Sequence, residues 1–312
     1  MTGAHDHAHA TSHFGRAFAI GVVLNLGFVL VEAFYGWKTG SLALLADAGH
    51  NLSDVAGLLL AWAAFAAARL KPNRRHTYGW RRASILASFI NAIVLLVAMG
   101  SLMWEASHRL QTPSALDGHT VIWVASIGVL INSITAWLFL SGSQHDLNIR
   151  GAFLHMAADA LVSVGVVLAG LLYLWRGWQW IDPVASILIA LIIIVGTWSL
   201  LRRSLHLLFD GVPDHIALDR VERTLLAIPG VIAVHDLHVW AMSTEENALT
   251  AHLVCTAAGN DGDALLHQAA AALNEGFGIK HSTLQCESSD YANSCSLTPG
   301  CSSTVSIHPH PH

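Results

Sequence analysis

The sequence predicts an α-helical membrane domain of six transmembrane helices, followed by a small cytoplasmic α/β domain. Only 12% of the 312 residues are charged, whereas soluble domains contain about 25%. The deficit is concentrated in long apolar stretches in the first two thirds of the chain. The composition changes near residue 207, and the length allows two domains.

Six apolar segments are long enough to cross a bilayer, whose hydrocarbon core of about 30 Å requires about 20 helical residues. They cover residues 16–37, 42–69, 83–107, 119–141, 151–175 and 182–206. The N-terminus lacks the basic region and short apolar run of a signal peptide. We therefore expect the first segment to remain as a permanent helix.

The basic residues predict the orientation of these helices. The loop after the second segment carries five of them: Lys71, Arg74, Arg75, Arg81 and Arg82. The first, third and fifth loops carry one each: Lys38, Arg109 and Arg176. The positive-inside rule then places the second loop and both termini in the cytoplasm.

The C-terminal part reads as an alternation of helices and strands. An amphipathic helix ends at Pro229-Gly230 and is followed by two strands, a helix and a strand, at 231–242, 248–255, 263–277 and 281–287. This order predicts a small sheet with helices on one face. The expected organisation is a His-rich tail (1–15), a membrane domain (16–207), an α/β domain (208–288) and a disordered Cys/His-containing tail (289–312).

Charge and composition exclude some functions and favour others. The net charge of −5 and the absence of a large basic block argue against nucleic acid as a partner. Histidine, the commonest metal ligand, occurs 20 times and outnumbers the 16 lysines and arginines. The four cysteines, Cys255, Cys286, Cys295 and Cys301, lie outside the apolar segments and are expected to be thiols in the cytosol.

The second and fifth apolar segments both contain the pattern H-x-x-x-D, as His50–Asp54 and His155–Asp159. A spacing of four places both side chains on one helix face. Ionisable residues inside a bilayer are costly and usually functional. One such pair could be an interhelical hydrogen bond, but two identical pairs favour a metal site between the helices.

Two imidazoles and two carboxylates form a tetrahedral set that suits Zn²⁺, although it does not exclude other cations. The absence of a thiolate argues against Cu(I). The same groups can bind protons when the metal leaves, so an exchange of metal for protons is natural. Asp47 could extend the site or only cap or pack the helix, and Glu32 and Asn25 could support the site or only join helices.

Several motifs in order resemble one family over residues 16–288: SLALLADAGHNLSD, TYGWRR, FLHMAADALVSVGVV, HDLHVWAMS, LTAHLV and HSTLQCE. The sequence is similar to the cation diffusion facilitator family, and within it to bacterial zinc/cadmium/cobalt efflux members. The resemblance implies a homodimer in the bacterial inner membrane that is a proton-coupled transporter with alternating access, not an enzyme. It also implies a ferredoxin-like, metallochaperone-like cytoplasmic domain.

The resemblance also carries metal ligands over to this chain. It assigns the transport site to His50, Asp54, His155 and Asp159. A histidine at position 50 implies a preference for zinc, and an aspartate there goes with cadmium tolerance; Cd²⁺ and Co²⁺ are further possible cargo. In the cytoplasmic domain, zinc as a regulatory ligand is expected at His235, His252, His281 and Glu287, and His267 matches a position that reaches a metal at the dimer interface.

Other histidines are left with open roles. His238 lies three residues after His235 and, with the period of two in a strand, is expected to face the other side. Some family members have a second site in the loop after the second helix, but here that loop offers only His76, a transient ligand or a surface residue. The N-terminal His5, His7, His9 and His13 could capture metal, whereas the C-terminal HPHPH is equally consistent with a solvated tail.

Two other functional classes compete with a transporter. An intramembrane metalloenzyme would need an open zinc position and a general base, but the sequence contains no H-E-x-x-H and four protein ligands would close the coordination shell. A membrane metal sensor that signals through its cytoplasmic domain would use the same ligands. It differs from a transporter because it need not move metal across a bilayer.

Overall fold

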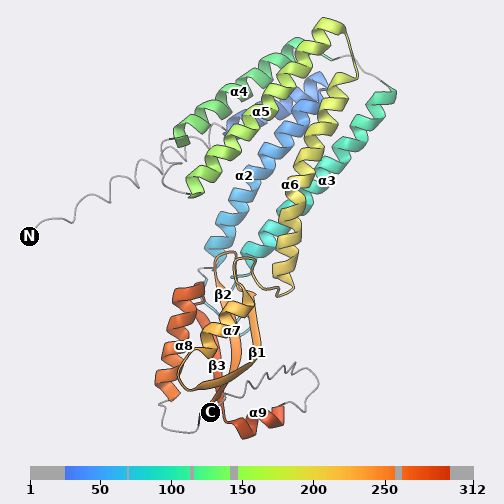
Figure 1. Cartoon of the computed structure of the whole chain (residues 1–312). Helices are drawn as coiled ribbons and strands as arrows, with labels where there is room; N and C mark the ends of the chain where they lie inside the picture. Colours follow the sequence, from blue (N-terminus) through green and yellow to red (C-terminus); the bar gives the residue numbers. More distant parts are fainter. Residues whose placement is uncertain (1–24, 69, 113–115, 141–146, 257–261, 296–312) are drawn as a thin grey trace, which may run out of the picture. The chain divides into compact units, whose positions relative to one another are not determined.

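The computed structural model describes residues 25–68, 70–112, 116–140, 147–256 and 262–295 (Figure 1). It divides into two compact units. The first contains residues 1–60 and 90–201, and the second contains residues 61–89 and 202–312. The N-terminal histidine run and the HPHPH segment both lie outside the described residues.

The first unit is helical, as predicted. A helix over residues 25–39 is followed by α2 (Leu42–Ala68), α3 (Ala83–Gln111), α4 (Gly118–Leu140), α5 (Leu147–Arg176) and α6 (Ile181–Leu208). Within the described residues, α3, α4, α5 and α6 are long and apolar enough to cross a membrane. The prediction of a helical membrane domain is confirmed, while the count of six spans stays a prediction.

The start of α2 is fixed to the start of α6. The Ser41 hydroxyl accepts a hydrogen bond from the Leu44 amide (3.2 Å) and donates one to Asp182 Oδ1 (2.6 Å). Asp182 Oδ2 accepts a further bond from the Leu42 amide at 2.9 Å. A carboxylate at a helix N-terminus satisfies free amides and opposes the helix dipole. This contact therefore sets where α2 begins, and with it the position of His50 two turns later.

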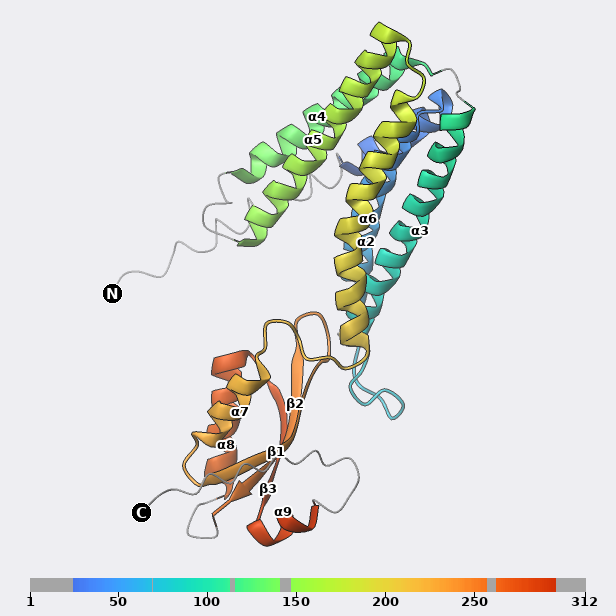
Figure 2. The ribbon, with the colours of Figure 1, turned by 45° about the vertical axis from the view of Figure 1, so that its right-hand side comes forward.

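Apolar side chains form the core between these helices. Its buried members include Phe28, Leu44, Met99, Val121, Val166 and Ile189. Gly128 on α4 allows a close approach, since a Cβ atom there would lie 2.7 Å from the Phe28 ring and 3.1 Å from Ser163 Oγ. In both views α4 and α5 run side by side (Figures 1 and 2).

The second unit has the predicted order of elements, with α7 (Leu218–Leu226), β1 (Val231–Ala241), β2 (Asn247–Cys255), α8 (Gly262–Phe277) and β3 (His281–Glu287). The sheet order is β1-β2-β3, in which β1 and β2 are antiparallel and β2 and β3 are parallel. The helices share one apolar core with the sheet, which includes Val221, Leu225, Leu253, Leu265 and Leu273.

Two features of this unit differ from expectation or extend it. A short helix, α9 (Ser289–Cys295), occupies the start of the segment predicted to be disordered. It forms because the Ser288 hydroxyl accepts a hydrogen bond from the Tyr291 amide in its first turn.

The loop after α2 joins this unit through an Arg81–Glu246 ion pair of 2.7 Å and an Arg82–Asp210 ion pair.

Candidate metal centre

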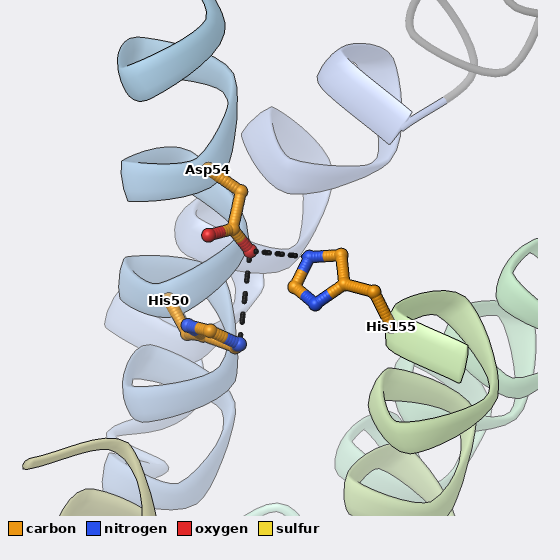
Figure 3. A group of neighbouring side chains, drawn as sticks. All are labelled: His50, Asp54 and His155. Carbon is orange, nitrogen blue, oxygen red and sulfur yellow. Dashed lines mark hydrogen bonds and ion pairs between the residues drawn. The ribbon is translucent and has the colours of Figure 1, made fainter. Parts of the chain in front are cut away.

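The structure brings together the four membrane residues that the H-x-x-x-D patterns predicted. His50 and Asp54 lie one turn apart on α2, and His155 and Asp159 lie one turn apart on α5. Asp54 Oδ2 lies 3.1 Å from His155 Nε2 and 3.6 Å from His50 Nε2 (Figure 3). Asp159 closes the ring, with Oδ1 3.5 Å from His50 Nε2 and Oδ2 3.7 Å from His155 Nε2.

These distances suit a metal ion at the middle of the ring. Zinc binds nitrogen and oxygen at about 2.0–2.1 Å in a tetrahedron, so neighbouring ligand atoms lie about 3.3 Å apart. Asp159 Oδ2 is buried without a hydrogen-bond partner among the described residues. The ligand atoms of His50, Asp54 and His155 all lie within 4.8 Å of one another. These three residues can therefore hold a dication, and Asp159 lies beside them as a candidate fourth ligand.

Access to this membrane cluster is unequal along the helices. The exposed fractions of the His155 and Asp54 side chains are 41% and 33%, compared with 20% for His50 and 2% for Asp159. Asp54 is the member nearest the C-terminal end of α2, and His155 is nearest the N-terminal end of α5. The centre is therefore open on the side of those helix ends and closed on the other.

Further polar residues line the closed side. Asp47, one turn before His50, is fully buried and accepts a hydrogen bond of 2.9 Å from the Ser163 hydroxyl. Glu32 is also fully buried. Asn25 is instead near the open side, where its amide contacts Sδ of Met156, the residue after His155, at 3.5 Å. Sequence analysis did not single out Ser163 or Asp182. Their only signal was a polar residue in an apolar helix.

A second cluster lies in the sheet of the C-terminal unit. His235 on β1 pairs directly with His252 on β2. Glu287 on β3 pairs with Val254, which lies two residues after His252 on β2. The Glu287 carboxylate lies 3.0 Å from His235 Nε2 and 2.8 Å from His252 Nδ1. His252 Nδ1 has no hydrogen-bond partner among the described residues, whereas Glu287 Oε1 also accepts a hydrogen bond from the Gln285 side-chain amide at 2.9 Å. These three residues fit a metal ion. Asp236 lies at the other ring nitrogen of His252, with Oδ2 3.8 Å from Nε2.

Three other histidines lie apart from this cytoplasmic cluster. His281 on β3 pairs with Ala248 on β2, and Ala248 lies four residues, or roughly 13 Å, along β2 from His252. The His281 ring packs against Tyr78. His267 lies on α8 beside Ser282 and Leu284. His238 does not follow the expected alternation, because the β1–β2 register shifts between His235 and His238. The His238 Nε2 atom lies 3.0 Å from Asp236 Oδ1, and the Asp236 carboxylate thus lies between His238 and His252.

A free cysteine, Cys255, lies three residues after His252. Burial, and then the adjacent Cys286, raise the pKa of the Cys255 thiol to about 11. Among the described residues, the group that could hold a metal here consists of imidazole and carboxylate and includes no thiol. His76, in the loop after α2, stacks on Trp80 with ring centroids 4.4 Å apart.

Comparison with known protein families shows to which family the chain belongs. The cation efflux transmembrane domain matches residues 18–209, and the cytoplasmic domain of cation efflux proteins matches residues 213–289. The chain belongs to the cation efflux, or cation diffusion facilitator, family. It is therefore a membrane protein for the efflux of divalent cations, and as a cation efflux protein it is a secondary transporter and not an enzyme.

Relatives match almost the whole chain. It is 40% identical to "Zinc transporter ZitB" of Escherichia coli over 99% of both chains. It is 36% identical to "Metal cation efflux system protein CzcD" of Cupriavidus metallidurans over 96% of both chains. It is also 36% identical to "Cadmium, cobalt and zinc/H(+)-K(+) antiporter" of Bacillus subtilis over 80% of both chains.

Proposed function

We propose that this cation efflux protein exports cytoplasmic Zn²⁺ in exchange for protons, by alternating access through His50, Asp54, His155 and Asp159. The observation that carries the proposal is the closed ring of two imidazoles and two carboxylates, with neighbouring atoms 3.1–3.7 Å apart. Four protein ligands leave no open coordination position for a reactive water, so the centre suits carriage of an ion.

The charges of the ring support exchange for protons. Two carboxylates neutralise the dication, which lowers the cost of placing it among apolar helices. After the metal leaves, the same imidazoles and carboxylates can take up protons. The name of the Bacillus subtilis relative, an antiporter for H⁺ and K⁺, supports protons as a counter-ion. The name of the Escherichia coli relative supports zinc as cargo, and the name of the Bacillus subtilis relative supports zinc together with cadmium and cobalt.

The exposure of the ring supports a direction. Its open side, at Asp54 and His155, leads to the helix ends next to the loops that the basic residues predict to be cytoplasmic. In this conformation the centre would receive zinc from the cytoplasm. Export then requires closure on that side and opening beside Asp159, which is 2% exposed.

Several wider features belong to the same proposal. The six spans place both termini in the cytoplasm of a bacterial inner membrane, with domain limits at residues 16–207 and 208–288. Two chains associate as a homodimer, in line with the family match of the cytoplasmic domain. Zinc at His235, His252 and Glu287 would regulate transport by binding one conformation more tightly than the other.

The cytoplasmic cluster also favours a second candidate function, a membrane metal sensor. A sensor would bind zinc in the same domain and pass the change to a partner, but it need not move metal across a bilayer. A folded protein that binds zinc but shows no zinc flux would identify a sensor and not a transporter.

The test is zinc flux in proteoliposomes with a pH gradient, comparing the wild type with Asp159→Ala. We expect proton-driven zinc movement in the wild type and at least about a 100-fold loss in the variant, because a buried ligand is removed. A matched control is His119→Ala, an exposed histidine at the start of α4, which should transport normally. A folded wild type that moves no zinc under either gradient direction would overturn the transporter and favour the sensor.

A further inference from the structure

A second acidic pair, Glu32 and Asp47, lies next to the membrane cluster. Asp47 precedes His50 by one turn of α2, and Glu32 comes from the first helix. Both side chains are 0% exposed, and Asp47 and Asn51 are among the neighbouring groups that act electrostatically on the Glu32 carboxyl. Within the described residues, neither Glu32 oxygen nor Asp47 Oδ1 has a hydrogen-bond partner.

Among the described residues, no lysine or arginine is available to neutralise this pair. The nearby titratable groups are Asp159 and His50 of the metal centre, and of these only His50 can carry a positive charge. Neither α2 nor α4 contains lysine or arginine. The basic residues of the other helices lie towards their ends: Lys38, Arg109, Arg150, Arg176, Arg202 and Arg203. Two buried carboxylates without a counter-charge do not both remain ionised, so the pair must hold a proton or a cation.

The donor set favours a proton over a metal. Zinc requires about four ligands, and the groups of described residues that could hold a metal do not include Glu32 or Asp47. Asp47 Oδ2 is already occupied by the Ser163 hydroxyl at 2.9 Å. This leaves both Glu32 oxygens and Asp47 Oδ1 buried without a hydrogen-bond partner among the described residues, and two neighbouring carboxyl groups in this state can share one proton.

The position of the pair links it to metal binding. Ser163 lies one turn after Asp159 on α5, just as Asp47 lies one turn before His50 on α2. The pair is therefore the next layer on the closed side of the centre, away from the exposed Asp54 and His155. A dication one helical turn away acts strongly on a carboxyl group where the dielectric is low, and it favours the ionised form.

We propose that Glu32, sharing a proton with Asp47, is a proton carrier outside the metal-binding ring and that it gives up this proton when zinc occupies the ring. The inference rests on the proposed function for its role in transport. The O–H bond of the carboxyl group breaks, the proton passes to water when the pair is opened, and the remaining carboxylate offsets the charge of the zinc ion. Binding of zinc and binding of this proton thus oppose each other, and the effect is reciprocal.

The first test counts protons released when zinc binds to the full chain in detergent micelles, measured with an indicator dye at low buffer concentration. Glu32→Gln should bind zinc yet release about one proton fewer per zinc ion than the wild type. Glu32→Asp should restore the wild-type count. The matched control is Glu105→Gln, an exposed glutamate ion-paired to Arg109 at 3.0 Å, which should release as many protons as the wild type.

The second test separates this inference from the proposed function. In proteoliposomes, Glu32→Gln should still exchange zinc down its gradient but should accumulate less zinc under a pH gradient. A wild type without proton-driven flux overturns the antiporter itself. A driven wild type whose Glu32→Gln variant matches it in proton count and accumulation overturns only the role of Glu32.

A third measurement needs no variant, in case Glu32→Gln does not fold. The infrared spectrum of the wild type should contain the C=O band of a protonated carboxyl group, and this band should weaken on addition of zinc. Its absence before zinc is added, or its persistence at saturating zinc, would overturn the proposal.

Discussion

The chain builds two His–carboxylate clusters in different ways. The membrane cluster joins two helices, each of which supplies one histidine and one aspartate at the same spacing of four. The cytoplasmic cluster joins three strands, each of which supplies one residue: His235, His252 and Glu287. The most exposed member of the membrane cluster, His155, is 41% exposed, compared with 25% for His252, the most exposed member of the cytoplasmic cluster.

A cluster on two helices and a cluster on three strands suit different functions. A cluster split between two helices comes apart when those helices move, which suits a cargo that must be taken up and released. A cluster on adjacent hydrogen-bonded strands keeps its geometry, which suits a ligand that stays bound.

The largest effect is expected from the exposed ligand of the membrane cluster. His155→Ala should lower zinc affinity at that cluster at least about 100-fold, because it removes one of four ligands and its contact with Asp54. Isothermal titration calorimetry of the full chain, with the cytoplasmic cluster removed by His235→Ala and His252→Ala, isolates this site. Unchanged affinity would exclude His155 as a ligand.

A smaller effect is expected at the cytoplasmic cluster. Glu287→Gln should weaken zinc binding there about 10- to 100-fold, because the carboxylate joins both histidines at 2.8–3.0 Å. Zinc flux at saturating zinc should persist, since the membrane ring is intact. His281→Ala is the matched control and should bind zinc as the wild type does. A loss of binding in His281→Ala would show that the cytoplasmic site uses ligands from elsewhere on β3.

The next prediction concerns metal selectivity at the membrane cluster alone. His50→Asp replaces one imidazole with a carboxylate and should shift the ratio of zinc to cadmium transport about tenfold towards cadmium, because ligand type governs selectivity. Flux of both ions in the same proteoliposomes measures this ratio. An unchanged ratio of zinc to cadmium transport, or a shift towards zinc, would show that His50 does not determine the metal selectivity.

The smallest effect concerns the thiols beside the cytoplasmic cluster. Because the pKa of Cys255 is raised to about 11, its thiol stays neutral at pH 7–8 and becomes a thiolate only as the pH rises towards that value. Alkylation of Cys255 should be roughly fivefold or more slower than that of the exposed Cys286 at pH 7.5. Peptide-resolved mass spectrometry measures both rates. Equal rates would show that burial does not protect Cys255.

The cytoplasmic domain shows where prediction from sequence is limited. The order of its helices and strands followed from turn residues and apolar runs, and His235, His252 and Glu287 followed from family resemblance. His281 was assigned to the same site, but the β2–β3 register places it opposite Ala248. Asp236 was missed, because it reaches His252 only through the irregularity at residues 235–238 and a positive φ of 49°.

The sequence by itself determined the helical membrane domain and the four residues of the membrane ring. It did so because the 3.6-residue period of a helix is a local property, which turns H-x-x-x-D into one ligand face wherever it occurs. Only the tertiary structure decided that α2 and α5 meet, that Ser163 binds Asp47, and that Glu32 neighbours the same carboxyl. These contacts depend on how distant segments pack and on strand register, which no local spacing encodes.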